Sequence, residues 1–320
     1  MPRPALARPL TLTALALCFP ALATAGVPKV ATDIAPTQSL VALVMGDLGQ
    51  PSILLSKGAN AHSYQMRPSE ARALDQADLV IWIGPEMTPW LDRAIAASGP
   101  ARPQLALLHA EGTKTRSFAG DGDEDEHEHE EGHDHGQDHE HTAGADGTIL
   151  DPHAWLNPGN AETWLTVIAD RLGTLDPEHK ATYAANAEAA RARIAEVDAR
   201  LEARLKPVAG KPFVVYHDAY GYFADRYGLA DAGSVSPGDA TDPGAAHLSE
   251  LRAELSAKQV VCAFPEAAHD PRPMQRLIEG TTTRLGGALD PAGTEMERGP
   301  DLYVRTLESL GDTLLACLDR

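Results

Sequence analysis

The sequence predicts an α/β protein of two lobes, each built on a parallel sheet, with one long α-helix between them. The chain has 320 residues, which is enough for about two domains of roughly 150 residues each. Short aliphatic runs alternate with helix-like stretches in both halves, and this alternation is typical of a parallel sheet covered by helices on both faces. A segment rich in Ala, Glu, Arg and Leu separates the two halves.

The first half contains three short apolar runs that we interpret as buried strands, because each is closed by Gly or polar residues. These predicted strands are residues 52–55, 79–83 and 105–108. The stretches between them have helical periodicity. The predicted helices are residues 69–77, with Ser69 as the N-cap after Pro68, and residues 89–97. Together they predict an N-terminal lobe of residues 26–175.

The segment from 177 to 205 is predicted to be a single helix, since Asp176-Pro177 is a typical helix start and no Gly or Pro follows. At about 1.5 Å per residue it would be about 43 Å long, which is longer than one small domain is wide. We interpret residues 176–206 as a rigid helix that links the lobes. The alternative is a long surface helix of a single domain.

The second half repeats the alternation of strands and helices, which predicts a C-terminal α/β lobe of residues 207–320. Its predicted strands are residues 213–216 and 260–264. Its predicted helices are residues 219–227, 247–257 and about 301–318.

The charge balance excludes two classes of partner. The chain carries 46 Asp and Glu against 27 Lys and Arg, for a formal net charge of −19. Phosphate backbones and anionic membranes repel such a chain, so we expect no nucleic-acid partner. The expected partner is cationic.

The N-terminus has the pattern of an export signal. Arg3 and Arg8 form its positive region, residues 10–22 form the apolar region, and residues 23–25 (Ala-Thr-Ala) form the cleavage signature. The apolar region is too short for a membrane span of about 20 residues. We therefore predict a signal peptide of residues 1–25, cleaved after Ala25, and an exported protein.

Two of the three cysteines remain after this cleavage. Cys18 lies inside the apolar region, and Leu17 stands directly before it, where a lipoprotein signal needs a small residue. An oxidising compartment favours pairing of the remaining Cys262 and Cys317. Two buried thiols are the alternative.

Three isolated histidines stand in turns or at the ends of predicted strands: His62, His153 and His217. Each alone is more often structural, but ligands of open α/β sheets bind in the crevice outside the carboxyl ends of strands. Asp290 offers an oxygen at the same kind of position, and a turn or N-cap role is its alternative. Three imidazoles and one carboxylate suit tetrahedral Zn²⁺, so together these residues predict a zinc site.

A second group of histidines lies in a strongly acidic segment. Residues 121–141 contain eleven Asp or Glu, six His and no Lys or Arg. Without apolar residues the segment cannot bury a core, so we predict a disordered loop over residues 119–147 that binds divalent metal weakly at several places. Its histidines are His127, His129, His133, His135, His139 and His141.

Six motifs, spread over essentially the whole mature chain, resemble one known family. They are residues 58–64 (Gly-Ala-Asn-Ala-His-Ser-Tyr), 67–69 (Arg-Pro-Ser), 77–87 (Ala-Asp-Leu-Val-Ile-Trp-Ile-Gly-Pro-Glu-Met), 151–156 (Asp-Pro-His-Ala-Trp-Leu), 216–223 (Tyr-His-Asp-Ala-Tyr-Gly-Tyr-Phe) and 289–291 (Leu-Asp-Pro). The sequence resembles the periplasmic zinc-binding proteins of ABC importers, in the ZnuA-like branch of the cluster A-I metal solute-binding proteins. The charged His-rich loop before the fourth motif is also similar.

This resemblance implies two Rossmann-like lobes joined by one long rigid helix, with a single metal site in the interlobe cleft. The metal-binding histidines of the family fall on His62, His153 and His217, and its aspartate falls on Asp290. A histidine at the third position is similar to the zinc-type members, which also share the disulfide that would join Cys262 to Cys317. An acidic neighbour of the first histidine, present in some relatives, is missing here, because Ala61 and Ser63 flank His62.

The resemblance implies a periplasmic solute-binding protein, not an enzyme, with Zn²⁺ bound as the transported substrate. The expected partners are an inner-membrane ABC zinc permease with its cytoplasmic ATPase and a periplasmic zinc chaperone, and the expected state is a monomer. A zinc hydrolase is one alternative, but His-Glu-x-x-His and Gly-x-Ser-x-Gly are both missing. A metal-sequestering protein or adhesin is the other alternative.

Overall fold

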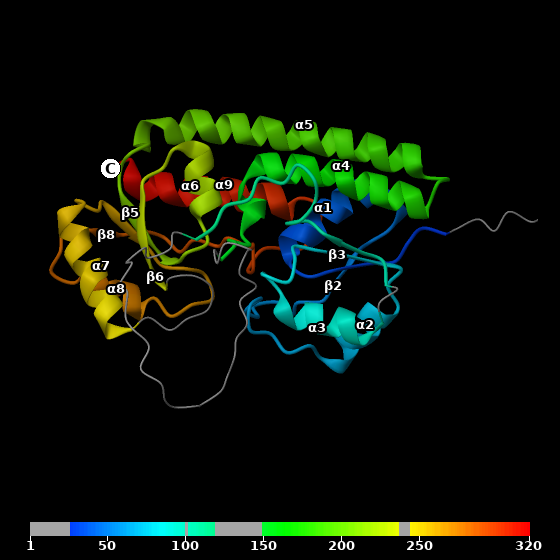
Figure 1. Cartoon of the computed structure of the whole chain (residues 1–320). Coiled ribbons are helices and arrows are strands. Elements are labelled where there is room, and N and C mark those ends of the chain that lie inside the picture. The colour runs from blue at the N-terminus through cyan, green and yellow to red at the C-terminus, as the bar shows by residue number, and fades with distance from the viewer. Residues whose placement is uncertain (1–25, 100–101, 119–148, 237–243) are drawn as a thin grey trace, which may run out of the picture.

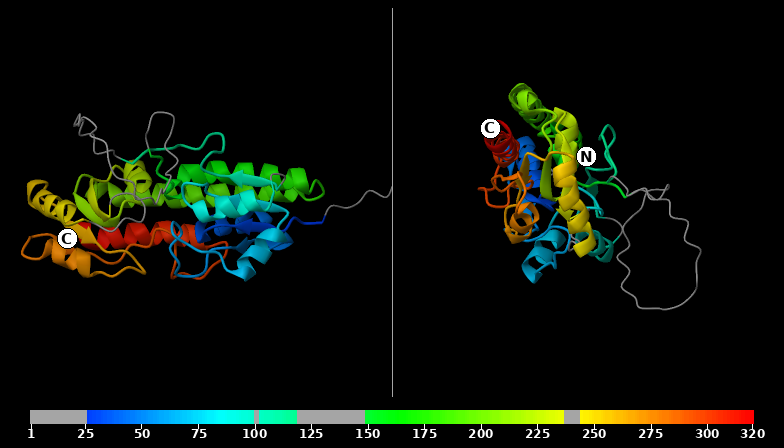
Figure 2. Two further views of the ribbon diagram at one scale, coloured as in Figure 1. Left: turned by 60° about the horizontal axis from the view of Figure 1, so that its bottom comes forward. Right: turned by 90° about the vertical axis from the view of Figure 1, so that its left-hand side faces the viewer.

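The computed structural model describes residues 26–99, 102–118, 149–236 and 244–320. The predicted signal peptide and the predicted His-rich loop, with its six histidines, lie outside these ranges. The described residues form two four-stranded parallel sheets with helices packed around them. The α/β prediction is therefore confirmed, and the sheets lie toward opposite ends of an elongated molecule (Figures 1 and 2).

The first sheet has the strand order β2-β1-β3-β4. Its strands are β1 (Val30–Thr32), β2 (Ser52–Ile53), β3 (Leu79–Trp82) and β4 (Gln104–Ala106). The helices of this half are α1 (Ala35–Met45), α2 (Pro68–Asp75), α3 (Pro89–Ala97) and α4 (Pro158–Leu175). Every residue of β1 and β3 is buried, as expected for strands covered on both faces.

The second sheet has the order β6-β5-β7-β8. Its strands are β5 (Phe213–His217), β6 (Asp231–Ser236), β7 (Cys262–Phe264) and β8 (Arg284–Leu285). The surrounding helices are α6 (Gly221–Tyr227), α7 (Ala245–Ala257), α8 (Arg272–Ile278) and α9 (Leu302–Leu318). Cys262 pairs with Phe213 at the start of β5, so β5 and β7 run side by side toward His217 at the end of β5.

The long helix is present as α5 (Lys180–Leu205), and its 26 residues span about 39 Å. It begins three residues later than predicted. Residues before Lys180 form a turn in which the buried Asp176 accepts hydrogen bonds from His179 Nδ1 (2.7 Å) and the Tyr183 hydroxyl (2.9 Å). Pro177 therefore lies in this turn and not in the first turn of the helix.

Helix α5 runs along one side of the molecule beside α4 and α9 (Figure 1). Three arginines of α5 pair with acidic residues at the start of and along α9. The pairs are Arg193–Asp301 (2.7 Å), Arg200–Glu308 (2.9 Å) and Arg204–Asp312 (2.5 Å). These exposed pairs lie along the contact between α5 and α9.

One hydrophobic core extends through both halves. Its members include Trp155 from the first half, Phe213 from the second and Tyr303 from α9. The other face of the second sheet packs against α7 and α8 in a smaller, separate cluster. Because the larger cluster is continuous, separating the two halves would expose buried apolar surface.

The chain also returns to the first half after β8. The Trp155 indole donates to the carbonyl of Pro291 (2.8 Å), and the Tyr303 hydroxyl donates to the carbonyl of Trp155 (2.7 Å). Ser39 in α1 donates to the carbonyl of Pro300 (3.1 Å). The predicted limits of the C-terminal lobe thus include a segment that packs on the first half, and those limits stay a prediction.

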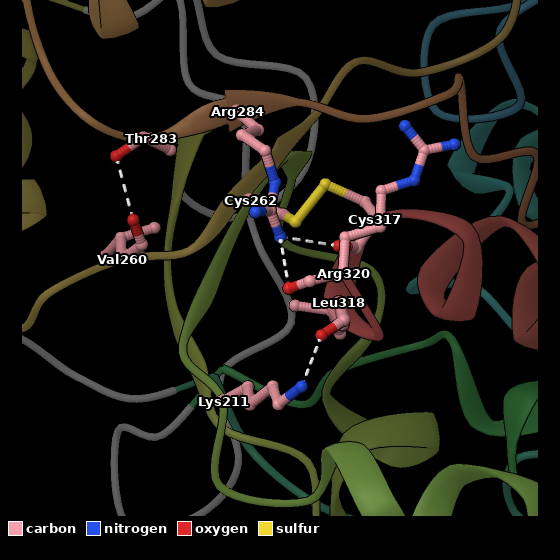
Figure 3. Close-up of a disulfide and its surroundings, with 8 residues drawn as sticks. All are labelled: Lys211, Val260, Cys262, Thr283, Arg284, Cys317, Leu318 and Arg320. Atoms are coloured by element: carbon pink, nitrogen blue, oxygen red, sulfur yellow. Dashed lines mark hydrogen bonds between the residues drawn. A yellow bond between two sulfur atoms is a disulfide. The ribbon is translucent and has the colours of Figure 1, made fainter.

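A disulfide joins Cys262 in β7 to Cys317 in α9 (Figure 3), which confirms the predicted pair. Arg284 in β8 donates to the Cys317 carbonyl (2.7 Å), and Lys211 donates to the Leu318 carbonyl (2.7 Å). These bonds attach the end of the last helix to the edge of the second sheet where β5 and β7 begin. None of the helices in the described ranges has the length and apolar character of a membrane span.

Candidate metal site

The structure brings together the three histidines that the sequence singled out. The ring centroids lie 5.6 Å apart for His62 and His153, 5.7 Å for His62 and His217, and 4.9 Å for His153 and His217. One ring nitrogen from each can be chosen so that all three atoms lie within 4.8 Å of one another. Such a spacing allows one ion to contact all three rings, since each Zn–N bond is about 2.0–2.1 Å long.

His62 lies in the loop that follows β2 in the first half. The Asn60 side chain accepts a hydrogen bond from the backbone N–H of His62 (2.8 Å), which closes a short turn. The buried Trp90 of α3 donates its indole N–H to the carbonyl of Ala61 (2.7 Å). This turn and the hydrogen bond from the buried Trp90 thus fix the loop that carries His62.

His153 lies just before the short 3₁₀ helix Ala154–Leu156 and is almost completely buried. Asp151 Oδ1 accepts two hydrogen bonds from this residue, one from the backbone N–H (2.9 Å) and one from Nδ1 (2.8 Å). The carboxylate therefore places the ring proton on Nδ1, so that Nε2 is the nitrogen suited to bind a metal.

His217 ends β5, at the carboxyl edge of the second sheet. Its Nδ1 lies 3.5 Å from Glu266 Oε1, and the Tyr220 hydroxyl donates to Glu266 Oε2 (3.0 Å). Burial opposes ionisation of Glu266, but the contacts with His217, His269 and Tyr220 outweigh it and lower the pKa of this carboxyl below its ordinary value. Glu266 is thus a buried carboxylate beside a candidate ligand, as Asp151 is beside His153.

Glu266 lies outside all of the sequence motifs, so no motif indicates its place beside His217. The available signal was its place, since it follows β7 at the same edge of the sheet as His217. Ligands of open α/β sheets bind in the crevice outside this edge. With 46 acidic residues in the chain, this position alone did not distinguish it.

Asp290 lies near the histidines but is not part of the group that they form. It lines the same cavity. Its Oδ1 accepts the N–H of Thr294 (2.9 Å), and its Oδ2 accepts the N–H of Glu295 (3.2 Å). In this arrangement the carboxylate closes a turn, which is the alternative role that the sequence left open. Metal binding by Asp290 stays a prediction.

The histidines open into a cavity of about 300 Å³ that both halves line. Its wall includes Met87 from the first half and His269 and Asp290 from the second, and the exposed Lys57 and Arg298 also contribute to it. Three imidazoles and nearby oxygen donors favour a borderline cation such as Zn²⁺ over Mg²⁺ or Ca²⁺, which prefer oxygen ligands. Neutral imidazoles are needed, so protons compete with the metal.

The chain matches a family model over most of its length. The model, ZnuA, is described as zinc-uptake complex component A, periplasmic, and it matches residues 30–317. The high-affinity zinc uptake system protein ZnuA of Paracoccus denitrificans is 51% identical over 306 residues, which cover 92% of this chain and 93% of that protein. The protein of the same name from Brucella suis is 37% identical over 307 residues, covering 91% and 92%.

Solved structures share the fold at lower sequence identity. A crystal structure of ZnuA has a TM-score of 0.73 at 21% identity and covers 91% of this chain and 99% of its own. The periplasmic zinc-binding protein TroA of Treponema pallidum has a TM-score of 0.73 at 18% identity and covers 92% and 100%. At these identities, the likeness concerns the arrangement of the two sheets and the helices.

Proposed function

Because the chain belongs to the family of periplasmic ZnuA zinc-uptake components, we propose that it captures Zn²⁺ in the periplasm and delivers it to an ABC-type importer. It is a zinc-binding solute-binding protein of a zinc import system. Zn²⁺ is its transported substrate. The proposed location rests on the periplasmic family, and we propose in addition that residues 1–25 are removed by cleavage after Ala25.

One observation carries the proposed binding site. Three histidines that are far apart in the sequence have ring nitrogens within 4.8 Å of one another at the junction of the two halves. We propose that His62, His153 and His217 bind the zinc ion. Asp290 is the proposed fourth ligand, in exchange for one of its turn hydrogen bonds.

The family works with an ABC permease and its ATPase. For this chain we propose in addition that it acts as a monomer and receives zinc from a periplasmic chaperone. The six histidines between His127 and His141 are proposed to collect zinc weakly outside the main site. The family consists of solute-binding transport proteins, and we propose that this chain catalyses no reaction.

Transport of radioactive zinc tests this function. Proteoliposomes that contain the cognate permease and ATPase, with ATP on the ATPase side, receive the zinc-loaded protein on the other side. We expect zinc uptake with the wild type and none with the triple variant H62A/H153A/H217A. The control is H109A, which removes an exposed histidine that pairs with Glu86. Equal uptake with the triple variant, or tight zinc binding by the wild type without uptake, would contradict the proposal.

A further inference from the structure

We propose that Arg116 is a positioning residue for zinc binding: its guanidinium fixes Asp151, and Asp151 in turn fixes the imidazole of His153. This inference rests on the proposed function, because it takes His153 as a zinc ligand. Arg116 does not line the cavity and would act on the metal only through Asp151.

The two carboxylate oxygens of Asp151 have different partners. Oδ1 accepts the two hydrogen bonds from His153, whereas Oδ2 accepts a hydrogen bond from Arg116 Nη1 at 2.9 Å. Asp151 has no exposed surface, and a buried carboxylate is costly unless it is paired. The guanidinium therefore supplies the opposite charge and also limits rotation of the carboxylate. A carboxylate held in this way keeps the His153 ring in one orientation and one tautomer.

Residues from both halves hold Arg116 in place. Its carbonyl accepts the N–H of Asp151 (2.9 Å), and its own N–H donates to the Tyr222 hydroxyl of α6 (2.9 Å). The same hydroxyl donates to the carbonyl of Asp151 (3.0 Å). The guanidinium Nε also lies 3.3 Å from the exposed Asp225 of α6. Arg116 thus connects the segment before His153 to a helix of the second half.

Gly221, the first residue of α6, provides independent support. A Cβ atom at this position would lie 1.4 Å from Arg116 Nη1 and 2.1 Å from Cζ. The guanidinium therefore occupies the space that any side chain at residue 221 would fill. Because the clash involves the far end of a long side chain and no backbone atom, G221A is expected to fold and to displace the guanidinium from Asp151.

The direction of the effect separates positioning from simple electrostatics. Arg116 carries a positive charge close to the site of a cation, so removing that charge would strengthen zinc binding if Coulomb repulsion dominated. Loss of positioning would instead weaken zinc binding. Partners that orient metal-binding histidines typically contribute about 10–100-fold to metal affinity. We expect about 10-fold for Arg116, since it acts one residue further from the metal.

Zinc affinity, measured by competition with a chromophoric chelator, tests the proposal. R116Q and G221A are each expected to weaken binding by about 10-fold. The double variant R116Q/G221A should be no weaker than R116Q, because both changes remove the same contact. R116K, which keeps the charge, should recover part of the affinity. The matched control is R102Q, which should keep the wild-type zinc affinity. It removes another mostly buried arginine, which donates to backbone carbonyls of the first half.

Nitrogen NMR of the metal-free proteins provides a readout that a purely structural role would not change. The wild type should show His153 as one tautomer with the proton on Nδ1, whereas R116Q should show a mixture. Wild-type zinc affinity in both R116Q and G221A would overturn the proposal. So would losses that multiply in the double variant, or a loss in R116Q with no recovery in R116K and no change in the His153 signals.

The same titrations separate this inference from the proposed function. If H153A retained the wild-type zinc affinity, the zinc site itself would be wrong. If H153A lost tight binding while R116Q kept it, only the role of Arg116 would be wrong.

Discussion

At the scale of single residues, buried carboxylates organise the molecule at several points. Asp151 and Glu266 contact two of the three candidate ligands. Asp33 is a third buried carboxylate, which lies away from the site at the carboxyl end of β1. Its carboxylate is fully buried and accepts the backbone N–H groups of Ile34 (2.7 Å) and Ile83 (2.8 Å). It thereby connects β1 to the start of α1 and to the end of β3.

Asp33 leads to a prediction about pH. Burial raises the pKa of this carboxyl to about 6, although hydrogen bonds from Ile83 and Ile34 oppose the shift. The folded protein therefore binds this proton more tightly than the unfolded chain does. The contribution of Asp33 to the free energy of unfolding is largest below pH 4 and falls as the pH rises to about 6.

D33N removes this dependence. The free energy of unfolding of D33N minus that of the wild type should therefore increase by about 2–3 kcal/mol from pH 4 to pH 7. Urea unfolding of both metal-free proteins at several pH values measures this difference. The other acidic groups are the same in both proteins, so their contributions cancel in the difference. A difference that stays constant over this range would show that Asp33 titrates normally.

The sequence identified the candidate ligands, but not the residues that hold them. His62, His153 and His217 each follow a predicted strand or lie in a turn, but so does His109 after the predicted strand 105–108. The resemblance to the zinc-binding family, which places metal-binding histidines at these three positions, was therefore needed to distinguish them. Asp151 lies two residues before His153 in the same motif, yet nothing in the sequence shows that its carboxylate faces the ring. Long-range partners such as Arg116 and Gly221, which come from different halves, depend on the folded arrangement alone.

At the scale of elements, the disulfide fastens α9 to β7. Cys262 pairs with Phe213 at the start of β5, whereas His217 is at the other end of that strand. At about 3.3 Å per residue, the bond is roughly 13 Å along the sheet from the candidate site. Its contribution should therefore be to stability and not to zinc binding.

The variant C262A/C317A tests this separation. Removing a disulfide that closes a sequence separation of 55 residues should lower the free energy of unfolding by about 2–4 kcal/mol. Urea unfolding measures this loss, and chelator competition should give wild-type zinc affinity for the same variant. A large loss of zinc affinity would contradict the separation of the two roles.

Strand prediction succeeded at the longer apolar runs, whereas β1, a buried strand of only three residues (Val-Ala-Thr), was not predicted. The runs that became β3, β5 and β7 are apolar because helices or other strands cover both faces. By contrast, β6 has the sequence Asp-Ala-Gly-Ser-Val-Ser, and β8 has two exposed residues. Backbone pairing with β5 and β7 determines both strands. Likewise, the start of α5 depends on the side-chain bonds of Asp176, which composition does not reveal.

At the scale of the whole molecule, the two halves share one core and several crossings. The chain passes between them through α5 and returns through the segment that includes Pro291 and Pro300. Buried hydrogen bonds such as that from Tyr303 to Trp155 join the two halves directly. A wide hinge opening would break these bonds and expose apolar surface.

We therefore expect zinc binding to cause little change of overall shape. Small-angle X-ray scattering of the metal-free and zinc-loaded proteins should give the same radius of gyration within error. Any movement on binding should be confined to the loops around the cavity, such as the one that carries His62. A clear contraction on adding zinc would show that the halves close on the ion and would contradict a rigid connection.

Anomalous diffraction at the zinc edge, from crystals of the zinc-loaded protein, tests the central claim most directly. The strongest peak should lie in the cavity between the halves, about 2.0–2.1 Å from one ring nitrogen each of His62, His153 and His217. The same map would show whether Asp290 provides the fourth ligand. A strongest peak outside this cavity, or one that fewer than three of these histidines contact, would contradict the proposed zinc site.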